Sequence, residues 1–501
     1  MKIIEKFKKK SSKLKGLILS SLMVKLFFIK YNFKKSLNIK NKSYTKNLLE
    51  DLSFLKSPNN IGLFPYNVWD CIAIHNIFNR LYKNSKLIHP NENKSRIEIF
   101  RLQNNLIKSF NLKSSKGIKN INIFNEDIKI LFNKINFLLK KDFGEYSYIA
   151  TYGIIDTLIK ELDKDLMLYG FYYNEKKLFI NIKKIVAIVR ELCNPHKTIF
   201  IAETAYLECS FIRAYSFKKN IKLFCLHPNG TFRMLIPKES PSESYISEEK
   251  KLLFGQNCKL KFKEIENLGK RYFKKRLKGE ASDSDSRYAF KNSISFSKKE
   301  IRKVLFLHCL RDANNINSSE DNIFKTYIEW TNYTLSKIKN MQDEWWIKIH
   351  PMSNFWRDDI QLIRELFKQN NINEQIAIDC PGTLEIIERR MPIFTCNGTV
   401  SLESLACGNY SLATGDRISK SLIKKPFNLK EYDEYLYMSV KNCIKEFKAT
   451  EKLSRLAKIL LMDTKSRCDL EHFFSYKYIQ ANDSLIQKTK IIITLGNKKH
   501  Q

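Results

Sequence analysis

Three of the chain's eight histidines are followed by proline, namely His89, His227 and His350, although the sequence contains only 11 prolines. His227 and His350 each come directly after an apolar run that predicts a buried strand. Proline cannot continue a central strand and biases the residue before it toward extended geometry. We therefore expect both histidines at the carboxyl edge of a sheet, where open α/β folds bind ligands. An imidazole there can donate to a phosphate oxygen, and Lys348 adds positive charge nearby; the plainer alternative is a histidine that bonds only the backbone.

A second chemical motif is the segment Phe394–Gly408, which reads Phe-Thr-Cys-Asn-Gly-Thr-Val-Ser-Leu-Glu-Ser-Leu-Ala-Cys-Gly. It predicts a strand that ends in a tight turn at Asn397 and Gly398, followed by a helix with Thr399 as its N-cap. Free amides at a helix start bind anions, and Glu403, one turn further on, can accept hydrogen bonds from ribose hydroxyls. The alternative is an ordinary capped helix with a solvated glutamate. The candidate residues for donor phosphate and nucleotide are Lys348, His350, Asn397, Gly398, Thr399, Ser401 and Glu403.

Acidic residues follow two further predicted strands. Glu203 follows an apolar strand in the first half, and Asp312 lies in the strand end that begins at His308. A carboxylate facing the donor phosphates across a cleft can act as a general base or bind an acceptor, so Glu203 and Asp312 are the candidate catalytic residues. His227 and His308 are candidates for the acceptor side or the cleft. For Glu203 the alternative is an acid at the start of the helix Thr204–Lys219, where the helix dipole favours negative charge.

Several common catalytic motifs are absent from the sequence. It contains no Gly-x-Gly, no P-loop, no Gly-x-Ser-x-Gly and no His-Glu-x-x-His, which argues against many dehydrogenases, ATPases, serine esterases and zinc proteases. The 11 cysteines are scattered singly without any Cys-x-x-Cys, so we expect buried reduced thiols rather than disulfides. No Cys/His cluster has the spacing of zinc ligands, so we expect no bound zinc.

The residues singled out above need elements to position them, and the apolar pattern predicts strands that alternate with helices. Such alternation is typical of parallel sheets covered on both faces. The predicted strands are Ile61–Leu63, Thr198–Ala202, Ile221–Leu226, Val304–His308, Trp345–Ile349, Ile376–Ile378, Pro392–Thr395 and Tyr410–Ala413. The predicted helices are Trp69–Leu81, most of Ser95–Phe143, Thr204–Lys219, Asn322–Lys339, Asp359–Gln369, Thr383–Arg390 and Val400–Cys407, with helices only beyond Glu431.

The polar stretch Ala281–Ser286 interrupts this pattern and predicts a linker between two α/β units. The expected fold is α/β, with two Rossmann-like domains facing a cleft and a helical C-terminal tail. The expected divisions are a basic amphipathic segment at 1–50, an acceptor domain at 51–280, a linker at 281–299, a nucleotide-sugar-binding domain at 300–430 and C-terminal helices at 431–501.

The chain has 501 residues and a formal net charge of +36. Lys, Asn, Ile and Phe are abundant together, which indicates an AT-rich coding bias, so the charge by itself does not predict a nucleic-acid partner. Residues 1–47 stand apart, with 14 lysines and one acid, Glu5. Their apolar runs are too short to span a bilayer. We expect either a basic amphipathic segment that lies on an anionic leaflet or a solvated tail.

The order of these motifs resembles the second domain of bacterial capsule polysaccharide biosynthesis proteins. The similarity covers residues 300–416 and lies in the strand followed by Asp312, in Trp-x-Ile-Lys-Ile-His350-Pro and in Asn397-Gly-Thr-Val-Ser-Leu-Glu403-Ser-Leu-Ala-Cys-Gly. That family consists of GT-B glycosyltransferases and includes the Kdo transferases; teichoic-acid glycerophosphotransferases share a similar arrangement. The resemblance implies that His350 and Thr399 contact donor phosphate and that Glu403 contacts the nucleotide ribose, without a bound metal. Many relatives have serine at the position of Gly398.

The predicted function is that of a cytoplasmic GT-B glycosyltransferase in capsule or lipopolysaccharide assembly. Its partners would be a nucleotide-sugar donor, a saccharide or lipid-linked acceptor and, through residues 1–47, the inner face of the cytoplasmic membrane, with no cofactor and no nucleic acid. The alternatives are a glycerol- or polyol-phosphate transferase of the teichoic-acid type, a nucleotide-sugar epimerase, and a non-enzymatic basic protein that binds membranes or nucleic acid.

Overall fold

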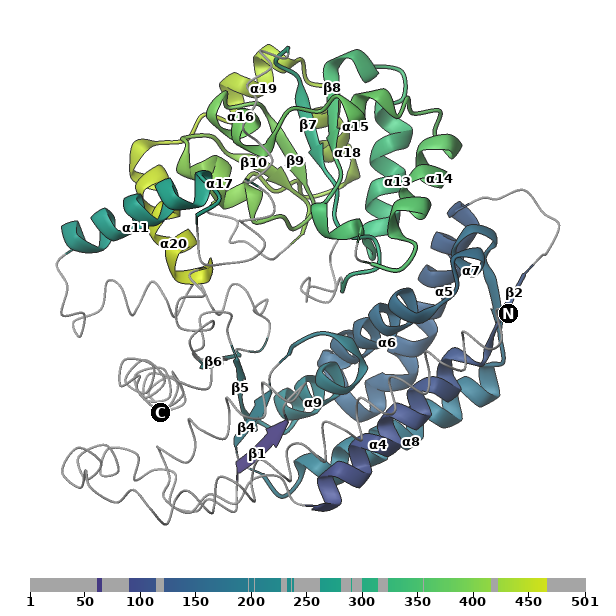
Figure 1. Cartoon of the computed structure of the whole chain (residues 1–501). Helices are drawn as coiled ribbons and strands as arrows, with labels where there is room; N and C mark the ends of the chain where they lie inside the picture. The colour runs from purple at the N-terminus through teal and green to yellow at the C-terminus, as the bar shows by residue number, and fades with distance from the viewer. Residues whose placement is uncertain are drawn as a thin grey trace, which may run out of the picture.

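The chain folds as a mixed α/β protein, mostly helical, with parallel strands at its centre (Figure 1). The computed structural model describes residues 61–64, 90–113, 121–196, 198–201, 203–226, 232–235, 237, 262–280, 290, 300–313, 323–354, 356–415 and 422–465. Residues 1–50, the predicted helix Trp69–Leu81 and all of the predicted linker except Phe290 lie outside these ranges.

The first sheet has the strand order β1-β4-β5-β6. Strands β1, β4 and β5 run parallel, and β6 is antiparallel to β5. The three parallel strands are the ones predicted from the apolar pattern of the first half. The bounds are β1 Ile61–Phe64, β4 Thr198–Ile201, β5 Lys222–Leu226 and β6 Phe232–Met234.

The second sheet is fully parallel, with the strand order β10-β9-β7-β8. Its strands are β7 Lys303–Phe306, β8 Trp345–Lys348, β9 Ile393–Thr395 and β10 Ser411–Ala413. Each strand is buried over nearly its whole length, as expected for a sheet covered on both faces. Four of the five strands predicted for this half are therefore confirmed.

The fifth predicted strand, Ile376–Ile378, is wrong, because this segment is the short helix α15, Gln375–Ile378. The backbone amides of Ile378 and Asp379 donate to the carbonyls four residues earlier. Only Ile376 is buried, whereas Ile378 is 70% exposed. A run of three apolar residues carries no period, so it cannot distinguish a strand from one turn of helix.

Helices surround both sheets. In the first half they are α4 Pro90–Ile107, α5 Ile121–Phe143, α6 Ser147–Glu161, α7 Lys164–Tyr169, α8 Glu175–Cys193 and α9 Tyr206–Lys218, with the antiparallel pair β2 Phe110–Leu112 and β3 Phe171–Tyr173. In the second half they are α13 Tyr327–Ile338, α14 Asp359–Gln369, α16 Thr383–Glu388, α17 Val400–Ala406, α18 Leu429–Tyr437, α19 Val440–Glu446 and α20 Glu451–Lys465. The 3₁₀ turns are η2 Gly144–Tyr146, η3 Gln342–Glu344 and η4 Pro351–Asn354. Beyond Glu431 the described residues form helices without strands, as predicted.

No helix within the described ranges is long and apolar enough to cross a membrane.

Helix α11, Phe262–Leu277, precedes the predicted linker but packs with the second sheet. It lies beside α20, and α20 in turn packs on α17 (Figure 1). Gly269 permits the close approach of α11 to α20, because a Cβ atom there would lie 3.0 Å from the backbone nitrogen of Ile459. This packing brings the C-terminal end of α11 to the same side of the sheet as the start of α17.

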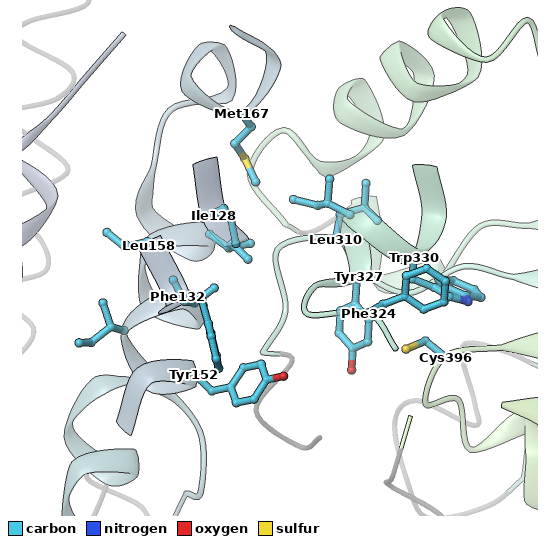
Figure 2. Packing of buried hydrophobic residues seen from close by; sticks show 14 of the residues in the cluster. Ile128, Phe132, Tyr152, Leu158, Met167, Leu310, Phe324, Tyr327, Trp330 and Cys396 are labelled. Carbon is cyan, nitrogen blue, oxygen red and sulfur yellow. The ribbon is translucent and has the colours of Figure 1, made fainter. Parts of the chain in front are cut away.

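One buried cluster joins the elements around the first sheet, the first half of the molecule, to those around the second sheet, the second half. Figure 2 shows Ile128 and Phe132 of α5 and Tyr152 of α6 facing Leu310 and Tyr327 of the second half. Polar contacts lie at the edge of this junction: the side-chain amide of Asn332 donates to Asn122 at 2.7 Å, and the backbone amide of Ile121 donates to Gln369 at 3.1 Å. The helices of the first half therefore pack directly on those of the second.

Arg311 is the buried polar centre of this junction. Its side chain is fully buried, and Nη1 donates to the carbonyls of Ile159 and Leu162 at the end of α6, at 2.8 and 2.9 Å. Nε pairs with Asp358 at 2.5 Å, and the backbone amide donates to Asp359 at 3.1 Å. One side chain thus connects the last turn of α6 to the loop after β7 and to the start of α14.

We predict that Arg311→Ala lowers the free energy of unfolding by roughly 3–5 kcal/mol, because it leaves the acceptors of a buried cation without their partner. Arg311→Lys should lose less, since it keeps the charge but cannot serve several acceptors with a planar fork. Chemical denaturation measures both, with Arg364→Ala, an exposed residue of α14, as the control. An Arg311→Ala protein as stable as the wild type would contradict the prediction.

Candidate functional site

A cavity of about 290 Å³ lies at the carboxyl ends of β7, β8 and β9. It brings together six of the residues predicted from sequence: His308, Lys348, His350, Gly398, Thr399 and Glu403. The other residues of its wall are Arg276, Phe306, Leu307, Ile349, Pro351, Met352, Gly382, Thr383, Thr395 and Val400. This is the edge at which open parallel sheets bind ligands.

His308 follows β7 and holds the neighbouring loop in place. Its Nε2 accepts a hydrogen bond of 2.9 Å from the backbone amide of Asn397, so the neutral ring carries its proton on Nδ1. The imidazole stacks on Tyr327, with the ring centres 4.5 Å apart and the planes 7° apart. His308 was predicted for the acceptor side or the cleft, and the structure places it in the wall of the cavity beside the predicted donor residues.

His350 follows β8, and its proline begins the turn η4. Its Nδ1 accepts from the backbone amide of Met352 at 3.2 Å and lies 3.4 Å from the sulfur of Cys309. Burial raises the pKa of Cys309 to about 12, so the thiol stays protonated and can donate to Nδ1. With Nδ1 acting as an acceptor, the neutral ring carries its proton on Nε2 and can donate it to a ligand. Lys348, also in the cavity wall, donates to the carbonyl of Pro381 at 2.9 Å.

In the loop after β9, Gly398 and Gly415 lie so close to neighbouring side chains that neither position has room for a Cβ atom. Asn397 is buried and donates to the Tyr327 hydroxyl at 3.3 Å, and a Cβ atom at Gly415 would lie 1.9 Å from its side-chain oxygen. At Gly398 a Cβ atom would lie 2.9 Å from the Thr395 hydroxyl, which accepts the Gly398 amide at 3.2 Å. A side chain as small as serine at this position would therefore displace Thr395. Asn397 shapes this loop but does not line the cavity.

Thr399 and Ser401 occupy the first turn of α17. Thr399 is the N-cap residue as predicted and lines the cavity, but its side chain makes no capping hydrogen bond. Its carbonyl accepts the amides of Leu402 and Glu403. Ser401 is fully buried, lies outside the cavity wall, and has no hydrogen-bond partner for its hydroxyl among the residues that the structure describes. It is therefore not placed to contact a ligand in this cavity.

Glu403 is paired with Arg276, a residue that the sequence analysis did not identify. Nε of Arg276 donates to Oε1 of Glu403 at 2.9 Å, and Nη2 contacts the same oxygen. Both side chains are almost fully buried, and both line the cavity. Within the described ranges no residue bonds Oε2 of Glu403. Arg276 ends the basic run Lys274–Arg276 of α11, and nothing in that run distinguishes it from solvated lysines.

Glu203 and Asp312, the predicted catalytic residues, lie close together where the two halves meet. Oε1 of Glu203 accepts the amides of Thr204 and Ala205 at 2.7 and 3.2 Å, just before α9 begins. Oδ1 of Asp312 accepts the Ala313 amide at 2.8 Å and the Tyr206 hydroxyl at 3.3 Å. The strand ends of the two sheets thus approach each other through Tyr206, whose φ of 61° is unusual for a residue other than glycine.

The pKa of Glu203 is raised above its usual value, chiefly because the carboxyl group loses water. The two backbone amides oppose this shift, the negative charge of Asp312 adds to it, and the positive charge of Lys160 lowers the pKa. The ammonium of Lys160 lies 3.9 Å from the centre of the Tyr206 ring. The helix-start contact expected for Glu203 is present, and it leaves Oε2 available for other chemistry.

His227 and His89 lie outside the described residues. Among the residues that are described, no group of three or more His, Cys, Asp or Glu side chains is arranged to hold a metal ion.

Arg276→Met should lower the free energy of unfolding by roughly 3 kcal/mol, because it leaves the Glu403 carboxylate buried without its counter-ion. The double variant Arg276→Met/Glu403→Leu should recover most of this loss, since a buried ion pair and an apolar pair of similar volume are often nearly equal in stability. A denaturation cycle over the two single variants and the double variant measures the coupling. Additive losses would show that the pair is not coupled.

Comparisons of the chain with protein-family models, with curated proteins and with solved structures found no match. The resemblance of residues 300–416 to capsule polysaccharide biosynthesis proteins therefore stays a prediction, and the case for a function rests on the cavity and its side chains.

Proposed function

We propose that the protein is a metal-independent glycosyltransferase of the GT-B type that uses a nucleotide-sugar donor in surface polysaccharide assembly. The observation that carries the proposal is the cavity at the carboxyl ends of β7, β8 and β9, with Lys348, His350 and the Arg276–Glu403 pair in its wall. A parallel-sheet edge with converging basic groups and one carboxylate matches the parts of a nucleotide: phosphates and a ribose diol.

The donor phosphates would lie between β8 and the start of α17. The Nε2–H of His350, the ammonium of Lys348 and the hydroxyl of Thr399 are hydrogen-bond donors in this part of the wall. Because α17 has only seven residues, its dipole alone is a weak anion site. The ammonium of Lys348, at the end of β8, supplies positive charge, and the neutral His350 adds a hydrogen-bond donor. As the glycosidic bond to the donor phosphate breaks, this field stabilises the charge that develops on the leaving oxygen.

The ribose would bind Glu403. Arg276 engages Oε1 and fixes the orientation of the carboxylate, so Oε2 can accept hydrogen bonds from a vicinal diol. A lone carboxylate in this wall would repel the phosphates, whereas the ion pair is close to neutral overall.

The acceptor would approach from the junction that holds Glu203 and Asp312. Glu203 would take the proton of the acceptor hydroxyl while that oxygen forms a bond to the anomeric carbon and the nucleotide phosphate leaves. Asp312 and Tyr206 belong to different halves, so their contact at 3.3 Å supports an acceptor side built from both halves. The GT-B arrangement, two Rossmann-like domains facing a cleft, is part of this proposal.

The donor site is tested by titration calorimetry with CMP, CDP, UDP and GDP. His350→Ala and Glu403→Gln should each weaken binding of the preferred nucleotide by roughly 1–3 kcal/mol, the cost of losing a hydrogen bond to a charged group. Glu403→Gln should bind a 2′,3′-dideoxy nucleotide about as well as wild type does, because the lost contact is to the ribose. His196→Ala and Glu434→Gln, which lie outside the cavity wall, serve as controls.

Unchanged nucleotide affinity in both cavity variants would overturn the donor site. Turnover of a CDP-polyol with release of CMP, without transfer from any nucleotide sugar, would instead indicate the polyol-phosphate transferase. One screen that includes both nucleotide sugars and a CDP-polyol as donors distinguishes these two results.

The acceptor side is tested by Glu203→Gln. The variant should abolish transfer while nucleotide affinity and melting temperature stay near those of wild type. In the wild type, the rate should rise with pH through the pKa of Glu203, which lies above the usual value for glutamate, because only the ionised form is a base. Glu208→Gln, in the first turn of α9, is the matched control. If Glu203→Gln keeps most of its activity and loses a little stability, Glu203 only stabilises the start of α9 and is not the catalytic base.

A further inference from the structure

The outer surfaces of α5 and α8 carry large apolar side chains in water. Phe137 of α5 is 80% exposed, Ile130, two turns earlier on the same helix, is 51% exposed, and Ile180 of α8 is 46% exposed. On each helix these residues lie at the middle of the exposed stripe, opposite the positions that pack into the core. A large exposed aromatic ring flanked by further apolar side chains marks a candidate contact surface.

Ion pairs connect the exposed sides of the two helices, which together we call the α5–α8 face. Lys134 pairs with Glu175 at 2.8 Å, and Asp142 pairs with Lys183 at 2.6 Å, so α5 and α8 run in the same direction within reach of each other's long side chains. The lysines of these pairs are themselves nearly half exposed, so the seam between the helices opens to solvent. In this register Ile180 lies level with the turn of α5 that carries Phe137.

The rim of the α5–α8 face is strongly basic. Its exposed cations are Lys129, Lys134, Lys140, Lys141, Lys176, Lys177, Lys183, Lys184 and Arg190. The acids on the same helix faces are Glu126, Asp127, Asp142, Glu175 and Glu191, of which Asp127 pairs with Lys113. Asp142 and Glu175 are used in the ion pairs across the seam, and Asp142 also contacts Arg190 at 3.2 Å. The face therefore keeps a net positive charge around an apolar centre.

We propose that the α5–α8 face docks on an anionic lipid surface. The combination of apolar side chains at the centre and lysines at the rim matches a bilayer with acidic headgroups, because the apolar groups enter the interface while the lysines meet the headgroups. A nucleic acid would use the charge but would leave Phe137 and the two isoleucines in water. A second copy of the chain would place two basic rims against each other. This face lies within the described structure and is separate from residues 1–47.

The test is co-sedimentation of the full chain with vesicles of phosphatidylcholine containing phosphatidylglycerol, and with vesicles of phosphatidylcholine alone. Phe137→Ser should weaken binding to the anionic vesicles about fivefold or more. Lys140→Glu/Lys141→Glu should weaken it about tenfold or more, and high salt should reproduce much of that loss. All variants should keep the wild-type melting temperature, since every changed residue is exposed.

Matched controls lie on the other half of the molecule. Phe427→Ser changes a phenylalanine that is 83% exposed, and Lys441→Glu/Lys445→Glu makes the same change in net charge on α19. Both controls should bind vesicles nearly as wild type does. The proposal is overturned if the full chain ignores anionic vesicles, if each control matches its partner variant, or if Phe137→Ser alters self-association but not vesicle binding. In the last case a second copy of the chain would cover the face.

Discussion

Two candidate half-sites, the cavity wall and the junction that holds Glu203 and Asp312, both depend for their position on the buried guanidinium of Arg311. A buried cation must be compensated, and this one is compensated by two carbonyls at the end of α6 and by Asp358. The residue sits in the loop after β7, three positions after His308 in the cavity wall and directly before Asp312 at the junction. Because the acceptors come from both halves, Arg311 keeps these partners only when the end of α6 lies against the loop after β7. The buried cation thus couples the relative placement of the two sheets to the position of the loop after β7, which contains His308 and Asp312.

Burial at this junction also changes the pKa of Asp359, an acid that accepts a hydrogen bond from Arg311. Asp359 accepts the Arg311 amide, and loss of water raises its pKa to about 6, although the nearby hydroxyl of Ser353 and the Arg311 amide and charge oppose the shift. A raised pKa means that the folded chain holds this proton more tightly than the unfolded chain does. Between about pH 4 and pH 6 the unfolded state loses the proton first, so the contribution of Asp359 to stability falls as pH rises through that window.

Much of the scaffold was predictable from the sequence, because buried parallel strands are continuous apolar runs and proline marks where they end. The motifs His350-Pro and Asn397-Gly therefore located the ends of β8 and β9, two of the three strand ends that line the cavity. The helix at Gln375–Ile378 was missed because three apolar residues have no period, and only tertiary packing decides between the alternatives. Arg276 was missed for a different reason: its role depends on α20 returning to hold α11 against α17, a contact far apart in sequence. In a lysine-rich chain, the sequence around one buried, ion-paired arginine does not distinguish it from the exposed cations beside it.

The two candidate half-sites differ in how firmly the fold determines them, and this difference follows from their hydrogen bonds. On the cavity side, His308 and His350 each use a ring nitrogen to accept a backbone amide, so the tautomer and the orientation of each ring are fixed before any ligand arrives. On the junction side, Glu203 and Asp312 each anchor one oxygen on backbone amides, and the Tyr206 hydroxyl shares the oxygen that anchors Asp312. A preorganised wall suits a ligand that is always the same, such as a phosphate ester. Carboxylates anchored at one oxygen suit a hydroxyl that must be held and then deprotonated, because the second oxygen can turn toward it without breaking the anchor.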